Sequence, residues 1–188
     1  MRLLHLANVW AICAGVFFAA GAGSGHAQDI RWKPEALRPG DVIVLEQDPY
    51  GRIHHVYRGR SGQAHVTQSV RGARVAGTPV FTTLTDDDGN HLRFTRADGT
   101  GMRYVPHDCS RTIGRCTYVE QNFDGTSERR MRITEATSTG FRFREFGEDG
   151  TPLFGGQFEL DSRGNAGAGR VEGQEGRVVT RVVGRSYE

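Results

Sequence analysis

Several features that would indicate a specific function are missing from this 188-residue chain. Lysine occurs once, at Lys33, and the other basic residues are arginines interspersed among nearly as many acids. The formal net charge of +2 provides no basic patch of the kind that nucleic acid requires. Gly-x-Ser-x-Gly, His-Glu-x-x-His and glycine-rich phosphate-loop sequences are all absent. We therefore predict no nucleic-acid partner and no cofactor, and we lean against an enzyme without excluding one.

Long apolar runs are also scarce. A single one, from Leu6 to about Ala22, follows Arg2 and ends in small residues, with Gly25 and Ala27 placed as a cleavage site needs them. This pattern predicts a signal peptide over residues 1–27, and an uncleaved anchor is the alternative. The mature form is then expected to have no transmembrane helix and to be periplasmic or extracellular.

Cysteine is rare as well. Of the three cysteines, Cys13 lies within the predicted signal peptide, which leaves Cys109 and Cys116 in the mature chain. In an oxidising compartment two such residues are expected to form a structural disulfide that closes a short loop. A redox-active pair favours Cys-x-x-Cys spacing, and a zinc site needs more ligands nearby, so we predict no metal here.

Helical patterns are few, apart from a short stretch between Pro34 and Pro39. About ten short segments instead show apolar residues alternating with polar ones, separated by turns rich in Gly, Asp and Asn. We predict an all-β antiparallel up-and-down meander, closed as a barrel or packed as a two-sheet sandwich. Residues 28–188 are expected to form one domain, in which a glycine-rich stretch separates N-terminal hairpins (28–78) from the main meander (79–188).

The most specific expectation concerns the segments between residues 116 and 160. Two-residue turns at Asp124-Gly125 and Asp149-Gly150, with an odd-length loop between them, would align their apolar residues on one face. That face comprises Cys116, Tyr118, Met131, Ile133, Phe141, Phe143, Phe154, Phe158 and Leu160. The opposite face comprises Arg132, Arg142, Arg144, Gln157 and Glu159.

The same register directs Glu145 toward the apolar face, between Met131 and Phe154. A carboxyl group there would have a raised pKa and would suit a general acid or a ligand anchor. A β-bulge or a place at the barrel rim is the alternative explanation. The candidate ligand-binding residues are therefore Glu145, Phe141, Phe143, Phe158 and Tyr118.

The histidines give a weaker indication. His54 and His55 alternate faces, so one of them shares a face with His65. If Tyr57 lies opposite His65, His55 is diagonal to it and within reach of a shared metal or proton. If Arg58 lies opposite instead, that pair is lost. No third ligand is spaced to complete a zinc site, and we predict no metal.

These observations favour a secreted or periplasmic β-barrel module that binds a small apolar or amphipathic ligand in its interior. The main alternative is a ligand-free structural or interaction protein of the cell envelope, working through an exposed sheet edge or the arginine-rich face. An outer-membrane barrel, or a hydrolase using Glu145 and a histidine, is less favoured. The first two possibilities differ in whether the interior is fully packed.

Overall fold

The computed structural model describes residues 30–72, 77, 79–174 and 176–187. The predicted signal peptide, residues 1–27, lies outside these ranges. The described chain holds twelve strands and one short 3-10 helix, η1 (Pro34–Ala36). Within the described residues, no helix is long and apolar enough to cross a membrane.

The strands are short and follow one another through tight connections. They are β1 (Val42–Asp48), β2 (Gly51–Ser61), β3 (Ala64–Arg71), β4 (Phe81–Thr85), β5 (His91–Arg96), β6 (Gly101–Val105), β7 (Gly114–Asn122), β8 (Ser127–Ala136), β9 (Gly140–Phe146), β10 (Pro152–Leu160), β11 (Ala166–Gly173) and β12 (Gly176–Arg185).

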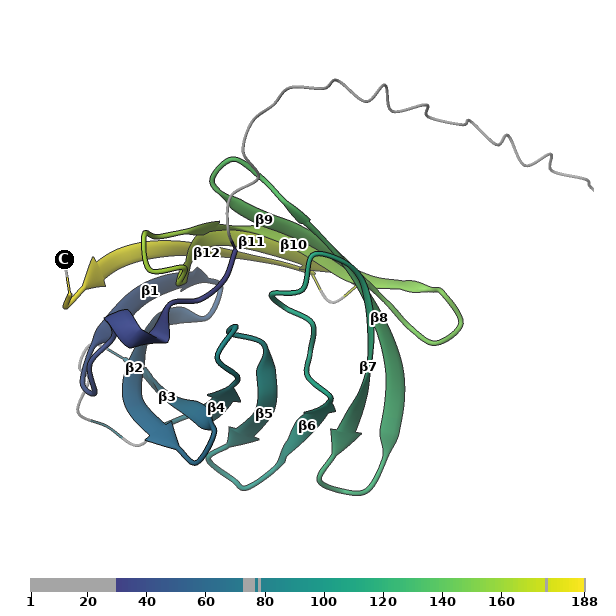
Figure 1. Cartoon of the computed structure of the whole chain (residues 1–188), viewed down its shortest axis with the longest axis horizontal. Helices are drawn as coiled ribbons and strands as arrows, with labels where there is room; N and C mark the ends of the chain where they lie inside the picture. The colour runs from purple at the N-terminus through teal and green to yellow at the C-terminus, as the bar shows by residue number, and fades with distance from the viewer. Residues whose placement is uncertain (1–29, 73–76, 78, 175, 188) are drawn as a thin grey trace, which may run out of the picture.

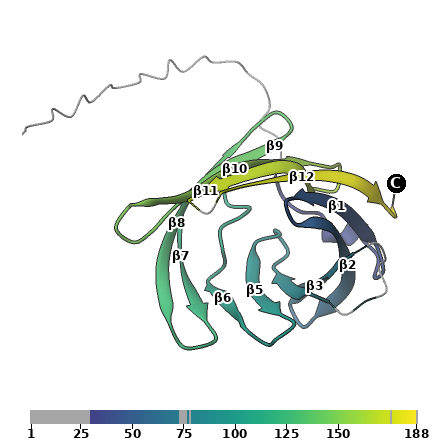
Figure 2. The ribbon, with the colours of Figure 1, turned by 180° about the vertical axis from the view of Figure 1, so that it is seen from behind.

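Each strand pairs antiparallel with the next, and β1 pairs with β12, so the sheet closes into an up-and-down barrel (Figures 1 and 2). The prediction of an all-β meander is confirmed, and the barrel is the correct one of the two closures. In both views the β4–β5 turn and the β6–β7 connection project within the outline of the ring, and one residue of each, Gly89 and Arg111, lines an interior cavity.

Strand β11 has a glycine-rich sequence, AGAGRVEG, although glycine in the interior of a strand normally weakens it. The structure gives a steric reason for one of these glycines. A Cβ on Gly169 would lie 2.3 Å from Cδ1 of Phe158, which belongs to the neighbouring strand β10. The glycine makes room for an aromatic ring, and the backbone remains a paired strand.

The predicted register is correct between β9 and β10, where Phe141 pairs with Phe158 and Glu145 with Phe154. It is wrong on β8. Arg132 pairs with Glu145 and is only 9% exposed, so it points into the barrel. Met131 and Ile133, predicted inside, point outward because successive side chains on a strand alternate.

The turns explain this reversal. The amide of Asn122 donates to the carbonyl of Thr126, which encloses three residues with Gly125 at φ 93°, and not the two that were expected. The next turn is closed by the amide of Thr137 and the carbonyl of Gly140 and encloses two residues, so its length is even and not odd. Each difference moves β8 by one residue, which is enough to exchange its two faces.

Part of the interior is filled by an aromatic core. Ile30, Phe141 and Phe143 are buried there, and partly buried neighbours pack against them: Ala136, Phe154, Phe158, Leu160 and Val171. The rings of Phe143 and Phe158 are stacked, with centroids 6.3 Å apart. Aromatic side chains therefore occupy this half of the barrel interior.

One end of the barrel is crossed by residues 30–37, here called the strap. The amide of Trp32 donates to the carbonyl of Asp88 in the β4–β5 turn, at 3.2 Å, and the amide of Lys33 donates to the carbonyl of Arg163 in the β10–β11 turn, at 2.9 Å. The strap thus links two turns on different sides of the ring.

Candidate functional site

The other half of the interior contains a cavity of about 590 Å³. Its apolar wall includes Ile43, Leu45, Phe81, Phe94 and Val178, from strands β1, β4, β5 and β12. Trp32 and Leu37 of the strap line one end. A volume of this size, with mostly apolar walls and a few polar groups, is typical of small-molecule sites.

His55 faces this cavity from β2. Its Nδ1 lies 2.7 Å from the Oγ of Ser69, a residue with no exposed surface. Burial, together with the nearby His91 and His54, lowers the pKa of His55 to about 4. His55 is therefore neutral near pH 7 and offers the cavity a neutral donor or acceptor instead of a charge.

His91 also lines the cavity, and Asp108 fixes its orientation. Nδ1 of His91 lies 2.7 Å from Oδ2 of Asp108, while Oδ1 of Asp108 accepts the backbone amides of His91 and Ser110. Burial alone would raise the pKa of Asp108, but His91 and the Arg132 guanidinium outweigh it and hold that pKa well below its usual range. Asp108 is thus an anion that orients the imidazole and favours a proton on Nδ1.

Behind the strap, side chains anchor Trp32 to the barrel. Its indole N–H donates to Oδ1 of Asn165 at 2.8 Å, and its ring packs edge-on against His65 and Tyr57. The hydroxyl of Tyr57 lies 2.7 Å from Nδ1 of His65, and Nε2 of His65 lies 2.9 Å from Asp87. These contacts make Trp32 a fixed part of the cavity end.

The histidine register differs from both alternatives considered from the sequence. His65 pairs with Arg60 and Tyr57 pairs with Thr67, after a register shift between Tyr57 and Gly59. His65 is engaged by Tyr57 and Asp87, and His55 by Ser69. His55 and His65 are thus bonded to different partners, and none of these contacts joins the two rings.

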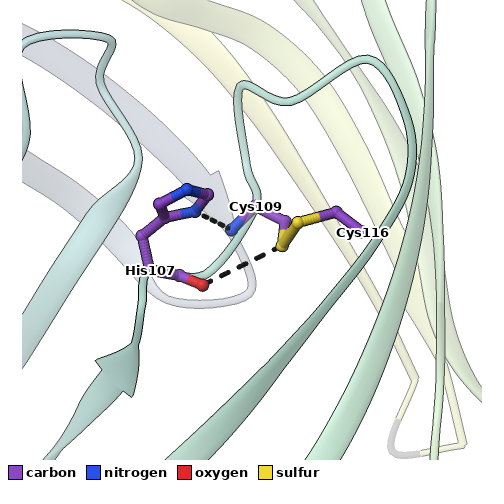
Figure 3. Close-up of side chains that lie close together, drawn as sticks. All are labelled: His107, Cys109 and Cys116. Carbon is purple, nitrogen blue, oxygen red and sulfur yellow. Dashed lines mark hydrogen bonds between the residues drawn. A yellow bond between two sulfur atoms is a disulfide. The ribbon is translucent and has the colours of Figure 1, made fainter.

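Cys109 and Cys116 form the expected disulfide, which is shown with the neighbouring His107 in Figure 3. The amide of Cys109 donates to Nδ1 of His107 at 3.1 Å. One ligand-type atom from each of these three residues lies within 4.8 Å of the others. Because both sulfur atoms are bonded to each other, neither is the thiolate that a metal would need.

The five candidate ligand-binding residues occupy different places. Phe158 lines the cavity, whereas Phe141 and Phe143 are 4% and 6% exposed within the aromatic core. Glu145 faces inward, as its register predicted, and accepts two hydrogen bonds from Arg132. Tyr118 lies beside it, and burial together with the Glu145 charge raises the pKa of the Tyr118 phenol. Among the five, the cavity lining contains Phe158 alone.

Sequence reasoning missed His91 because an extra residue, Leu92, lies between it and the rest of the hairpin. Phe94 faces the cavity, and strict alternation from Phe94 would turn His91 outward. The register shifts between Leu84 and Thr85, so that Thr85 pairs with His91 and both line the cavity. No local motif marks this shift, and Asp108 lies 17 residues after His91.

Comparisons of the chain with protein-family models, curated proteins and solved structures found no match. The functional argument therefore starts from the geometry of the cavity.

Proposed function

We propose that this chain is an exported β-barrel module that binds a small apolar or amphipathic ligand in its interior. The observation that carries the proposal is the unequal filling of the barrel. One half is packed by the aromatic core, while the other leaves about 590 Å³ between apolar walls. The interior of a small barrel is either filled by side chains or holds a ligand. The unfilled half of this barrel is the kind of interior that holds a ligand.

The outer surface gives less support to the alternatives. The described strands form a closed ring, so none of them has a free edge for a partner strand. The outward face of β9 and β11 exposes Arg142, Arg144 and Arg170, whereas a lipid-facing strand would carry apolar side chains there. An interaction protein would have to use this arginine-rich face.

Export is proposed on two grounds. The N-terminal sequence fits a signal peptide cleaved after Ala27, which would release residues 28–188 as a single domain. The Cys109–Cys116 disulfide is compatible with an oxidising compartment such as the periplasm or the extracellular medium.

Native mass spectrometry of the protein purified from its producing cell tests both parts. A small molecule that leaves on denaturation would support the binding function and identify the ligand class. The denatured mass would also report cleavage after Ala27 and the loss of two hydrogens in the disulfide.

A matched pair of variants tests whether the ligand occupies this cavity. Thr83 lines the cavity, while Thr82 lies on the opposite face of the same strand. Thr83→Phe should weaken binding of the apolar fluorophore N-phenyl-1-naphthylamine at least about tenfold by filling the space, and Thr82→Phe should change it less than about twofold. Equal binding by both variants, together with a bare native mass, would contradict the proposal and favour the arginine-rich face.

A further inference from the structure

Three polar residues of the cavity lining lie close to the strap. Thr85 and His91 flank the β4–β5 turn that binds Trp32, and Arg111 binds the carbonyl of Ile30. Thr85 is 8% exposed, and its Oγ1 has no hydrogen-bond partner among the described residues. A buried hydroxyl without a partner is costly. Oγ1 itself has almost no accessible surface, so a ligand in the cavity would supply the missing bond after the Thr85 side chain rotates toward it. We call these three residues the polar end.

His91 lies beside this hydroxyl, because Thr85 and His91 are paired across β4 and β5. The bond to Asp108 uses Nδ1 of His91. Nε2 is therefore the ring nitrogen left for a ligand in the cavity, and on protonation of the ring it becomes a charged donor.

Arg111 supplies a positive charge to the same end. Its Nη1 donates to the carbonyl of Ile30 at 3.2 Å, and its guanidinium lies 5.1 Å from the centre of the Phe141 ring. Burial lowers the pKa of Arg111 to about 10, while Asp108 and Asp161 act in the opposite direction, so the group stays charged at neutral pH. The planar guanidinium suits a carboxylate.

The acidic groups around the cavity are already engaged. Asp108 is bound by His91 and by the amide of Ser110, and it lies 3.7 Å from Arg132. Asp41 accepts the amide of Arg38 and lies 3.7 Å from Arg163. Because these carboxylates already have partners, they have little capacity left for a cationic ligand.

We infer that the ligand is an amphiphile with a carboxylate head, which binds the polar end while its apolar chain lies along the wall formed by Leu45, Phe81 and Phe94. This inference rests on the proposed binding function and adds the chemical class of the ligand. Thr85 and Arg111 donate to the carboxylate oxygens, and His91 contributes Nε2–H when protonated.

Three probes of equal chain length separate the head group from the chain: octanoate, 1-octanol and octylamine. Their affinities for the disulfide-bonded mature protein are measured by isothermal titration calorimetry. Octanoate should bind at least about tenfold more tightly than 1-octanol, because charge-assisted hydrogen bonds contribute more than neutral ones. Octylamine should bind most weakly, because its positive charge would lie beside that of Arg111.

Thr85→Val tests the polar end with little risk to the fold, since it removes a hydroxyl that has no partner in the protein. It should weaken octanoate binding about five- to tenfold and leave 1-octanol binding unchanged. Thr82→Val is the matched control on the outward face of the same strand, and it should change octanoate binding less than about twofold. Arg111→Gln, checked for folding by circular dichroism, should abolish the preference for octanoate over 1-octanol.

The outcomes distinguish the inference from the proposal beneath it. If the three probes bind equally, if octylamine binds most tightly, or if Thr85→Val and Thr82→Val weaken octanoate equally, the carboxylate inference is wrong although the cavity still binds ligands. If none of the probes binds and Thr83→Phe has no effect on the apolar fluorophore, the binding function itself is wrong.

Discussion

Arg132 and Glu145 form a buried ion pair between strands β8 and β9. Nε and Nη2 of Arg132 donate to the same Oε2 of Glu145, at 2.9 and 2.7 Å, and the two residues are 9% and 2% exposed. The guanidinium also lies 4.7 Å from the centre of the Phe143 ring and 3.7 Å from Asp108. An arginine can lie inside this barrel because carboxylates and an aromatic face replace its water.

Removing the charge of Glu145 should therefore destabilise the protein strongly. Glu145→Gln leaves Arg132 buried with only the more distant Asp108 as counter-ion, and we expect a loss of about 3 kcal/mol in the free energy of unfolding. Glu135→Gln is the control, because Glu135 pairs with Arg142 on the exposed side of the same two strands and should cost less than about 1 kcal/mol. Urea denaturation followed by Trp32 fluorescence measures both, and similar losses would contradict the prediction.

The strap should be sensitive to any side chain at Gly164. This glycine has φ 75°, and a Cβ on it would lie 2.1 Å from the carbonyl oxygen of Arg31. Gly164→Ala should cost about 3 kcal/mol or displace the strap, because the backbone and not a flexible side chain must move. Gly125→Ala has a similar positive φ with open space around it and should cost about 1 kcal/mol. Equal losses in urea denaturation would mean that the contact with the strap does not contribute to the loss of stability in Gly164→Ala.

The fold could be predicted further than the site. Alternating segments and turn residues were enough for an all-β meander, and the aromatic residues of β9 and β10 were placed correctly because a bulge between Pro152 and Phe154 compensates for a three-residue turn. The same turn chemistry at Gly125 has no such compensation and reverses β8. Turn lengths of two and three residues are hard to distinguish around Asp-Gly, and each error exchanges the faces of a whole strand.

The polar end of the cavity is harder still to predict. The position of His91 depends on a bulge in β5, and Arg111 belongs to the disulfide-closed loop, whose path has no repeating pattern. Glu145 was placed inside correctly, but its partner Arg132 was assigned to the outer face by the reversed strand. Long-range pairing, and not composition, determines these positions.

Loss of the disulfide should affect both stability and binding. Replacing Cys109 and Cys116 with serine opens a short loop, and the loop-entropy relation gives about 2.5 kcal/mol of lost stability. Arg111 lies inside that loop, so octanoate affinity should fall more than 1-octanol affinity. Wild-type protein treated with dithiothreitol should reproduce the variant by calorimetry and urea denaturation. Unchanged octanoate affinity in a folded variant would show that the loop holds Arg111 without the disulfide.

The pH dependence of stability should show a contribution from His55. Its pKa is lowered from 6.5 to about 4 in the folded protein, so the unfolded chain binds more protons between these values. The free energy of unfolding should therefore fall as the pH decreases from 6.5 to 4, by roughly 3 kcal/mol in total. Asp108, whose pKa is lowered, adds a further loss only below about pH 4.

A variant at His55 isolates this contribution. His55→Gln can keep a hydrogen bond to Ser69 but does not titrate, so the loss between pH 6.5 and 4 should become smaller by most of that amount. Thr82→Val is the control, because Thr82 lies outside the cavity lining and carries no titratable group, so it should keep the wild-type slope. Urea denaturation at pH 7.0, 5.5 and 4.5 measures all three proteins. An unchanged slope in His55→Gln would mean that the pKa of His55 is not lowered in the folded protein, because water that enters the cavity solvates the charged imidazole.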